Sequence, residues 1–184
     1  SIRENNEMTE AIPLFDKIES EQVRVIARHM KVIYLNEKQQ LFAEGDSGNY
    51  MCFIVSGTLE VFKQSQTGNM VSVSTLYQGR SIGEMALTDA FPRSATVIAQ
   101  TPSTLLTITR SSFDQIVKDC PRAGLSLLKS LSRVLSLYLR RTSGQLADAR
   151  EASGSVTLAP VLKDKANKES ILIDHIINRK PSSP

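Results

Sequence analysis

Between residues 31 and 108 the sequence repeats one pattern, in which short runs rich in β-branched and aromatic residues are separated by turns that contain glycine. The runs lie at 32–35, 40–42, 51–55, 59–62, 71–76, 95–99 and 104–108. The turns between them include Glu44-Gly45-Asp46, Ser56-Gly57, Gln66-Thr67-Gly68-Asn69 and Gly79. Seven or eight short strands at this spacing are typical of two packed antiparallel sheets. The sequence therefore predicts a mainly β fold, an antiparallel β jelly roll.

Helical periodicity flanks these strands on both sides. Residues 9–30 carry apolar residues three to five positions apart, and Ser20 is expected to cap a helix there. A short amphipathic helix is predicted from Ser111 and should end before Pro121, because the residue before a proline is disfavoured in a helix. A longer helix over 122–143 follows, with an apolar series of Leu125, Leu128, Leu131, Leu135 and Leu139, beside which lie Val134 and Tyr138. We expect one domain at 9–145, with an N-terminal helix and two C-terminal helices, and a tail at 146–184 that is poorly ordered or a short helix.

Composition excludes several classes of protein. The 184 residues suit one domain with an appendage, and the net charge of +3 is too small to indicate nucleic-acid binding. Cys52 and Cys120 are too far apart for a metal site, and two cysteines do not make a disulfide scaffold. No apolar run approaches the length of a membrane span, and no signal peptide is recognisable. We expect a cytoplasmic protein that does not contact a membrane, unless the chain is part of a larger membrane protein.

One segment between two predicted strands differs from its surroundings. It runs from Ile82 to Val97, and the helix-forming residues Glu-Met-Ala-Leu follow Gly83 before Pro92 ends the segment. The start of a helical turn leaves backbone N–H groups unpaired and attracts anions. Arg93 can grip two oxygens of the same anion, and Glu84 can accept a hydrogen bond from a hydroxyl. The segment is therefore suited to a phosphate that lies beside a ribose hydroxyl.

This segment resembles the phosphate-binding cassette of the cyclic-nucleotide-binding domain family, which includes the catabolite activator protein and the regulatory subunits of cyclic-AMP-dependent kinase. The resemblance extends over about residues 10–143 and includes the turns at 44–46 and 56–57 and the proline at 121. Phe91 is bulkier than the residue expected before the proline, so the tip of the cassette is expected to differ in shape. The resemblance implies a sensor whose ligand is a cyclic nucleotide.

The resemblance also implies a role for each matching residue. Glu84 would accept from the ribose 2′-hydroxyl, Arg93 would pair with the phosphate, and backbone groups of Gly83, Met85, Ala86 and Ala95 would surround the sugar-phosphate. Ser94 favours cyclic AMP (cAMP) over cyclic GMP (cGMP), without excluding cGMP. Tyr138 falls near the position that covers the base, with Leu139 and Thr142 as rivals. We expect the Arg93 side chain to be largely exposed to solvent before the ligand binds.

The sequence also allows other interpretations of this segment and of the domain. Arg93 and Glu84 could form a simple surface ion pair, or the domain could be a degenerate one that binds no ligand and serves only for dimerisation or interaction. The chain could also be the sensor fragment of a larger effector protein. An enzyme is not expected, because the two histidines are far apart and no nucleophile–base pair or phosphate-binding P-loop is present.

Two expectations concern the partners of the chain. The leucine series of the 122–143 helix predicts a parallel homodimer. No helix-turn-helix follows that helix, so sequence-specific DNA binding is not expected. In a sensor of this kind, a hinge near Asp119-Cys120-Pro121 would let the long helix move when ligand binds.

Overall fold

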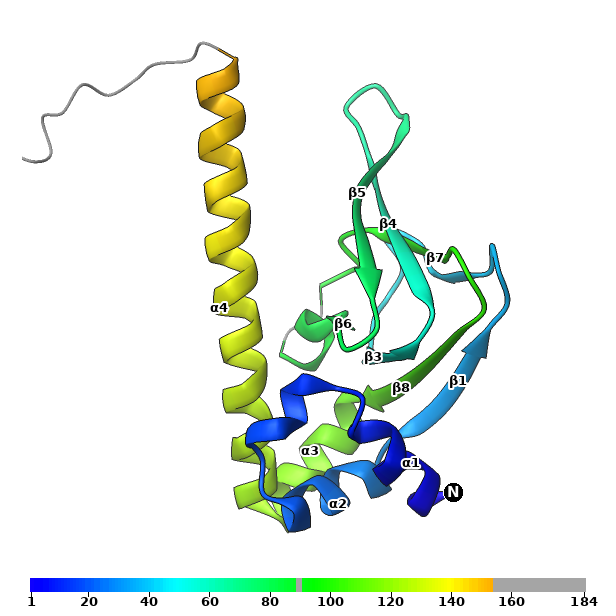
Figure 1. The fold of residues 1–184 in the computed structure, drawn as a ribbon, viewed down its shortest axis with the longest axis vertical. Coiled ribbons are helices and arrows are strands. Elements are labelled where there is room, and N and C mark those ends of the chain that lie inside the picture. The colour runs from blue at the N-terminus through cyan, green and yellow to red at the C-terminus, as the bar shows by residue number, and fades with distance from the viewer. Residues whose placement is uncertain (89–90, 154–184) are drawn as a thin grey trace, which may run out of the picture. The chain divides into compact units, whose positions relative to one another are not determined.

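A computed structural model of the chain describes residues 1–88 and 91–153 and confirms the jelly roll. Two four-stranded antiparallel sheets pack face to face, with strand orders β1-β8-β3-β6 and β2-β7-β4-β5 (Figure 1). The strands are β1 Lys31–Leu35, β2 Gln40–Phe42, β3 Tyr50–Ser56, β4 Thr58–Gln64, β5 Met70–Tyr77, β6 Ser81–Ile82, β7 Thr96–Ala99 and β8 Ser103–Thr109. Seven of them match the predicted runs, and the two-residue β6 was not foreseen because it is too short to show a period.

Strand β3 has both faces buried, which explains its unbroken apolar run. Met51 and Phe53 pack against the helices, whereas Cys52 and Ile54 pack into the space between the two sheets. Successive side chains of a strand point to opposite faces, so each of these pairs serves a different core. The molecule therefore has one core between the sheets and a second between the first sheet and the helices.

The N-terminal helical region consists of three pieces, and only the second and third fall within the range 9–30 that was predicted as helical. They are α1 (Ile2–Thr9), a 3₁₀ helix η1 (Pro13–Lys17) and α2 (Ser20–Arg28). The break comes at Pro13, because the preceding Ile12 is extended, with a φ of −117°, as expected before a proline. Ser20 was also predicted wrongly as a cap: it is the first residue of α2, and Glu19 holds the cap position.

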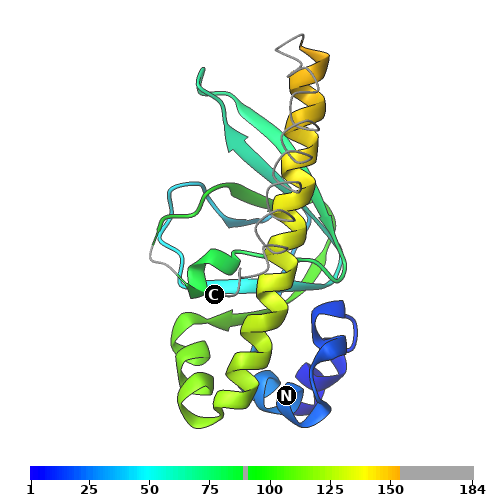
Figure 2. The ribbon, with the colours of Figure 1, turned by 90° about the vertical axis from the view of Figure 1, so that its left-hand side faces the viewer.

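Two helices follow β8 and complete the helical side of the core. Helix α3 (Arg110–Asp119) is capped by Thr109, whose side chain accepts a hydrogen bond from the backbone N–H of Ser112. Helix α4 (Pro121–Ala152) follows α3 with one residue between them, and it continues beyond residue 143, where the sequence pattern weakens. Helices α1, α2 and α3 gather at one end of the sandwich (Figures 1 and 2).

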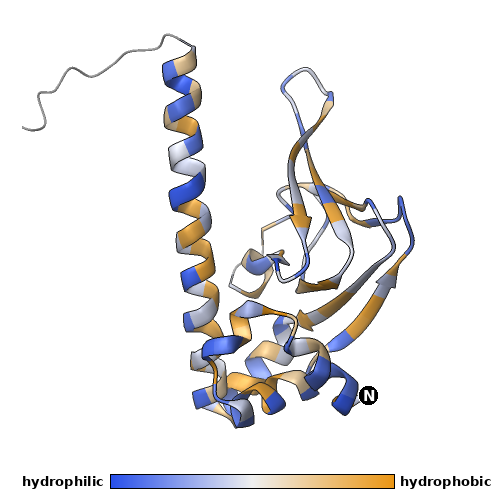
Figure 3. Ribbon diagram, viewed as in Figure 1, coloured by the Kyte–Doolittle hydropathy of each residue, from blue (hydrophilic) through white to orange (hydrophobic). Residues whose placement is uncertain are grey.

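The leucines of α4 divide between the core and the surface. Leu127 and Leu131 are buried in the helical core, and Val134 packs against them. Leu131 therefore belongs to the core and not to an exposed stripe, whereas Leu125 and Leu128 are exposed. Figure 3 shows apolar residues recurring along the helix.

By its internal contacts the chain divides into two units, Ser1–Ser136 and Leu137–Pro184, and the second begins within α4. The predicted tail at 146–184 is helical up to Ala152, and its residues from 154 onward lie outside the described part of the chain. The predicted domain boundary at 145 stays a prediction.

Candidate functional site

A single turn of 3₁₀ helix, η2 (Glu84–Leu87), stands between β6 and β7 where the sequence predicts one helical turn. Gly83 precedes it with a φ of +81°, a conformation that residues with a side chain rarely adopt. The backbone N–H of Ala86 donates to the carbonyl oxygen of Gly83 at 3.0 Å and closes the turn. Glycine is therefore required at the entry to this segment.

The turn forms one wall of a cavity of about 190 Å³. The residues that line it are Phe42, Val61, Ile82, Gly83, Glu84, Met85, Ala86, Phe91, Pro92, Arg93, Ser94 and Ala95. All seven residues predicted for the cassette are among them. Met85 and Phe91 are 52% and 72% exposed, so the cavity has an apolar rim that contacts solvent.

Arg93 is buried, with only 6% of its surface exposed, and the prediction that it faces solvent is wrong. Its guanidinium carbon lies 4.0 Å from the centre of the Phe42 ring and 4.6 Å from that of the Tyr50 ring. Its Nη2 donates to the backbone oxygen of Tyr50 at 2.8 Å. The side chain therefore lies against β2 and β3, which contribute these aromatic rings from opposite sheets.

No acidic residue in the described part of the chain is paired with the guanidinium of Arg93. Within residues 1–88 and 91–153, no carboxylate forms an ion pair with it, and its buried Nε finds no hydrogen-bond partner. A buried donor without a partner costs about 1–3 kcal/mol. The site therefore holds a positive charge and an unused donor beside a cavity.

Glu84 is the second charged residue of the cavity, and it is 9% exposed. Its Oε1 accepts a hydrogen bond from the Ser81 hydroxyl at 2.6 Å, and Ser81 is also buried. Since Arg93 and Glu84 are both buried and form no ion pair with each other, they are not a surface ion pair. Ser81 thus holds the Glu84 carboxylate in place, and nothing in the sequence motif indicated that Ser81 has this role.

The main chain of Arg93 is held by the turn at 43–46. Its N–H donates to the oxygen of Asp46 at 2.7 Å, and its own oxygen accepts from the N–H of Gly45 at 2.9 Å. The N–H of Glu44 donates to the Thr96 hydroxyl at 2.9 Å. The sequence identified the turn, but not its contact with the cassette some 50 positions later.

Burial changes the acidity of two groups of β3 near the site. It raises the pKa of the Cys52 thiol to about 12 and also raises the pKa of the Tyr50 hydroxyl. Both groups are therefore uncharged at neutral pH, and neither supplies a nucleophile to the cavity.

Tyr138, predicted to cover the base, lies in the second unit. Its place relative to the cavity is not described, so this role stays a prediction.

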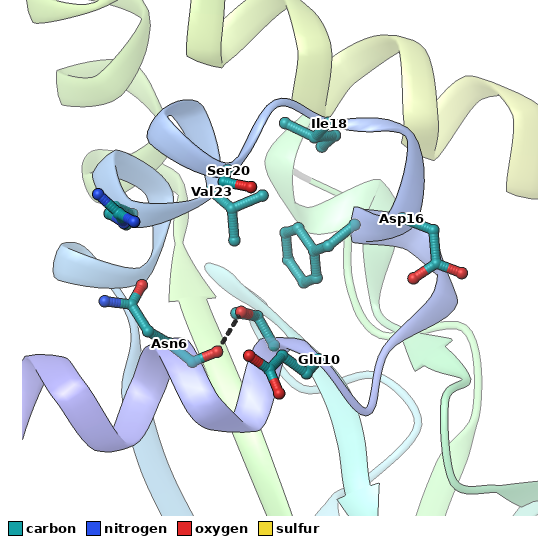
Figure 4. A pocket seen from close by; sticks show the side chains of 9 residues that line it. Asn6, Glu10, Asp16, Ile18, Ser20 and Val23 are labelled. Carbon is teal, nitrogen blue, oxygen red and sulfur yellow. Dashed lines mark hydrogen bonds between the residues drawn. The ribbon is translucent and has the colours of Figure 1, made fainter.

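A larger cavity of about 340 Å³ lies among α1, η1 and α2 (Figure 4). Asn6, Glu10, Asp16, Ser20 and Arg24 contribute its polar side chains. The Thr9 hydroxyl donates to the backbone oxygen of Asn6 at 2.6 Å at its wall. Its charged side chains are exposed, and it contains none of the predicted site residues, so size alone does not make it the functional site.

Residues 32–120 match the family model of the cyclic nucleotide-binding domain. These residues belong to the cyclic nucleotide-binding domain family. The matched range contains every residue that lines the cassette cavity. No helix in the described part of the chain has both the length and the apolar character needed to cross a membrane.

Two curated proteins are similar to this chain in sequence. A cAMP-dependent protein kinase regulatory subunit of Yarrowia lipolytica is 30% identical over 106 residues, which are 58% of this chain and 27% of that protein. A CRP-like cAMP-activated global transcriptional regulator of Mycobacterium tuberculosis is 24% identical over 135 residues, 73% of this chain and 58% of that protein. The chain thus spans between about a quarter and three fifths of the length of these relatives.

Solved structures agree with the family assignment. A cyclic nucleotide-binding domain from Methylobacillus flagellatus superposes with a TM-score of 0.72 and 27% identity, over 80% of this chain and 83% of that one. The catabolite activator protein of Thermus thermophilus has a TM-score of 0.65 and 24% identity, over 73% of this chain and 62% of that one. The second likeness concerns the fold alone.

Proposed function

We propose that this chain is a sensor that binds a cyclic nucleotide, cAMP in preference to cGMP, in the cassette cavity. The observation that carries the proposal is the buried guanidinium of Arg93, which lines the cavity and has no carboxylate partner among the residues that the structure describes. A phosphate oxygen would provide the acceptor that its Nε lacks. Ser94 and the names of the two curated relatives, both of which refer to cAMP, support the choice of base.

The proposed roles follow the chemistry of each group. Arg93 pairs with the cyclic phosphate, and Glu84, held by Ser81, accepts from the ribose 2′-hydroxyl. The backbone of Gly83, Met85, Ala86 and Ala95 surrounds the sugar-phosphate, and Tyr138 covers the base. A phosphate and a hydroxyl donor together match the two charged residues of the cavity, which is why a cyclic nucleotide fits better than a simple anion.

Signalling is proposed to pass from the cassette to the C-terminal helices. Leu87, the last residue of η2, is buried in the same core as Phe113 and Ile116 of α3. A movement of η2 on ligand binding must therefore repack against α3, and Cys120 alone separates α3 from α4. Ligand binding would then shift the population of positions that α4 adopts.

The exposed leucines of α4 support a homodimer as the form in which the sensor works. Leu125, Leu128, Leu135, Leu139 and Leu146 are between 38% and 69% exposed. Their spacing fits the alternating steps of three and four of a heptad, in which Ser132 and Thr142 occupy the remaining positions. Such a series on a helix is typical of a parallel two-stranded seam.

The experiment that tests the ligand is calorimetry with cAMP, cGMP and 5′-AMP on the wild type and on Arg93→Met. Methionine keeps a long chain against the two rings but removes the charge, so we expect cAMP affinity to fall by about a hundredfold or more. Arg28→Met, at an exposed position of α2, is the matched control and should bind as the wild type does. A folded wild type that binds no cyclic nucleotide would overturn the proposal and favour a ligand-free dimerisation domain.

A further inference from the structure

The Phe42 and Tyr50 rings form a corner around the guanidinium of Arg93. Their centres are 6.5 Å apart, with an angle of 73° between the ring planes, and the guanidinium carbon lies within 4.6 Å of both. Phe42 ends β2 in one sheet and Tyr50 begins β3 in the other, so the corner bridges the two sheets. The Tyr50 hydroxyl donates to the backbone oxygen of Leu41 at 3.3 Å, which ties its ring to β2.

Two glycines lie against the sides of the guanidinium that the rings do not cover. A methyl group on Gly48 would lie 2.6 Å from Nε of Arg93, and one on Gly83 would collide with its Nη1. Backbone and ring atoms therefore surround the group closely, and Nη2 is further fixed by the backbone oxygen of Tyr50. The guanidinium has little freedom to take another position while this packing persists.

Aromatic rings hold a cation in a way that suits an anion site. A carboxylate would also hold Arg93, but its charge would compete with a phosphate for the same donors. A ring face attracts the guanidinium through its quadrupole and leaves the positive charge uncompensated. The corner can thus fix the arginine before ligand arrives without weakening its attraction for an anion.

We infer that Tyr50, with Phe42, is a positioning residue that preorganises Arg93 for the ligand phosphate and so determines cyclic-nucleotide affinity. This inference rests on the proposed function of the same site. Tyr50 does not touch the ligand in this scheme, since it is absent from the residues that line the cavity. It acts through the side chain that does line it.

Calorimetry with cAMP on the full chain tests the inference through Tyr50→Leu and Tyr50→Phe. Loss of the ring should weaken binding between about threefold and thirtyfold, as expected for a desolvated cation–ring contact. Tyr50→Phe keeps the ring and should stay within about twofold of the wild type. Tyr34→Leu, at a tyrosine that is 66% exposed on β1, is the matched control and should leave affinity unchanged.

A spectroscopic measurement separates positioning from a general loss of structure. The Nε–H resonance of Arg93, assigned by its absence in Arg93→Met, should be shifted by the ring currents in the wild type and in Tyr50→Phe. In Tyr50→Leu, or in Tyr50→Met should the leucine variant not fold, that shift should shrink. Wild-type affinity in a folded variant without the ring would overturn the inference and leave the proposed function standing, whereas a wild type that binds no cyclic nucleotide overturns both.

Discussion

Gly124 of α4 lies so close to Val117 of α3 that a methyl group added to it would be 2.7 Å from the Val117 Cγ2 atom and 3.0 Å from its Cα. The second of these atoms belongs to the backbone, so a change of side-chain rotamer cannot relieve the clash. The two helices meet here, just after the residue that separates them. Their approach therefore depends on the absence of a side chain at position 124.

We predict that Gly124→Ala destabilises the fold by about 1–3 kcal/mol, because the methyl group forces α3 and α4 apart. Urea unfolding followed by circular dichroism measures this. Gly144→Ala, in the same helix, is the control: nothing lies within 4 Å of its added methyl group, so the substitution should stabilise by about 0.5–1 kcal/mol. Equal effects at the two positions would show that helix propensity, and not packing, determines the change in the free energy of unfolding.

Glu84→Gln should weaken cAMP binding less than Arg93→Met does. An amide oxygen still accepts from a ribose hydroxyl, and the exchange of a charged for a neutral acceptor costs about 1 kcal/mol, roughly fivefold in affinity. The decisive comparison uses 2′-deoxy-cAMP, which lacks the hydroxyl. With this ligand the wild type and Glu84→Gln should bind alike, and a persistent fivefold difference would contradict the assigned contact.

The homodimer prediction concerns the leucine series of α4. The double substitution Leu135→Glu with Leu139→Glu places charges in the proposed seam and should give a monomer in light scattering. Leu137→Glu is the control, because Leu137 is 62% exposed but falls outside the steps of three and four. A wild type that is monomeric at high concentration, with and without nucleotide, would rule the seam out.

The two thiols should differ in reactivity. Burial raises the pKa of Cys52 to about 12, so almost no thiolate forms at pH 8, whereas Cys120 is partly exposed. A disulfide reagent should therefore label Cys120 first and reach Cys52 only when the protein unfolds. In Cys120→Ser the fast phase of thiol labelling should vanish. If a fast phase persists, Cys52 reacts in the folded protein, which would contradict its burial.

The raised pKa of Cys52 also has a consequence for stability at high pH. An acid whose pKa is higher in the folded protein keeps its proton there after the unfolded chain has lost it. The stability linked to this group is therefore complete below the ordinary thiol pKa and is lost as pH rises through that value toward about 12.

The strands were predictable because their period and their turns are local properties of the chain. The break at Pro13 could have been anticipated, but the apolar spacing of residues 9–30 was interpreted as helical throughout, and α1, which precedes this range, was not predicted. Leu131 was counted in the leucine series of the dimer, but it is buried in the helical core, because periodicity shows that a helix face is apolar and not which partner covers that face. Helix α4 outlasts its apolar pattern, which ends well before Ala152.

The candidate site was predictable as a motif but not as an environment. Residues 83–86 and 91–95 lie close together in sequence, and they also lie together around the cavity. The burial of Arg93 depends on Phe42 and Tyr50, which come from strands more than 40 positions earlier, so no local pattern could reveal it. The hydroxyl of Ser81 was overlooked as the partner of Glu84 for a different reason: it lies only three positions away, but it precedes the residues of the motif.

Two backbone hydrogen bonds join Arg93 to Gly45 and Asp46, so the two sides of the cassette cavity are attached to the rest of the fold in different ways. On the side of Arg93, these bonds connect backbone to backbone. A displacement of the Arg93 backbone would therefore have to break both hydrogen bonds or move the 43–46 turn with it. On the opposite side, the single turn η2 is closed by its own hydrogen bonds and is joined to α3 by Arg110, whose Nε–H donates to the backbone oxygen of Ala86 at 2.8 Å. The wall of the cavity that carries Arg93 is thus anchored to the 43–46 turn, whereas the wall formed by η2 is anchored to α3 through Ala86 and Leu87, so a ligand that contacts both walls would join the turn to the helix.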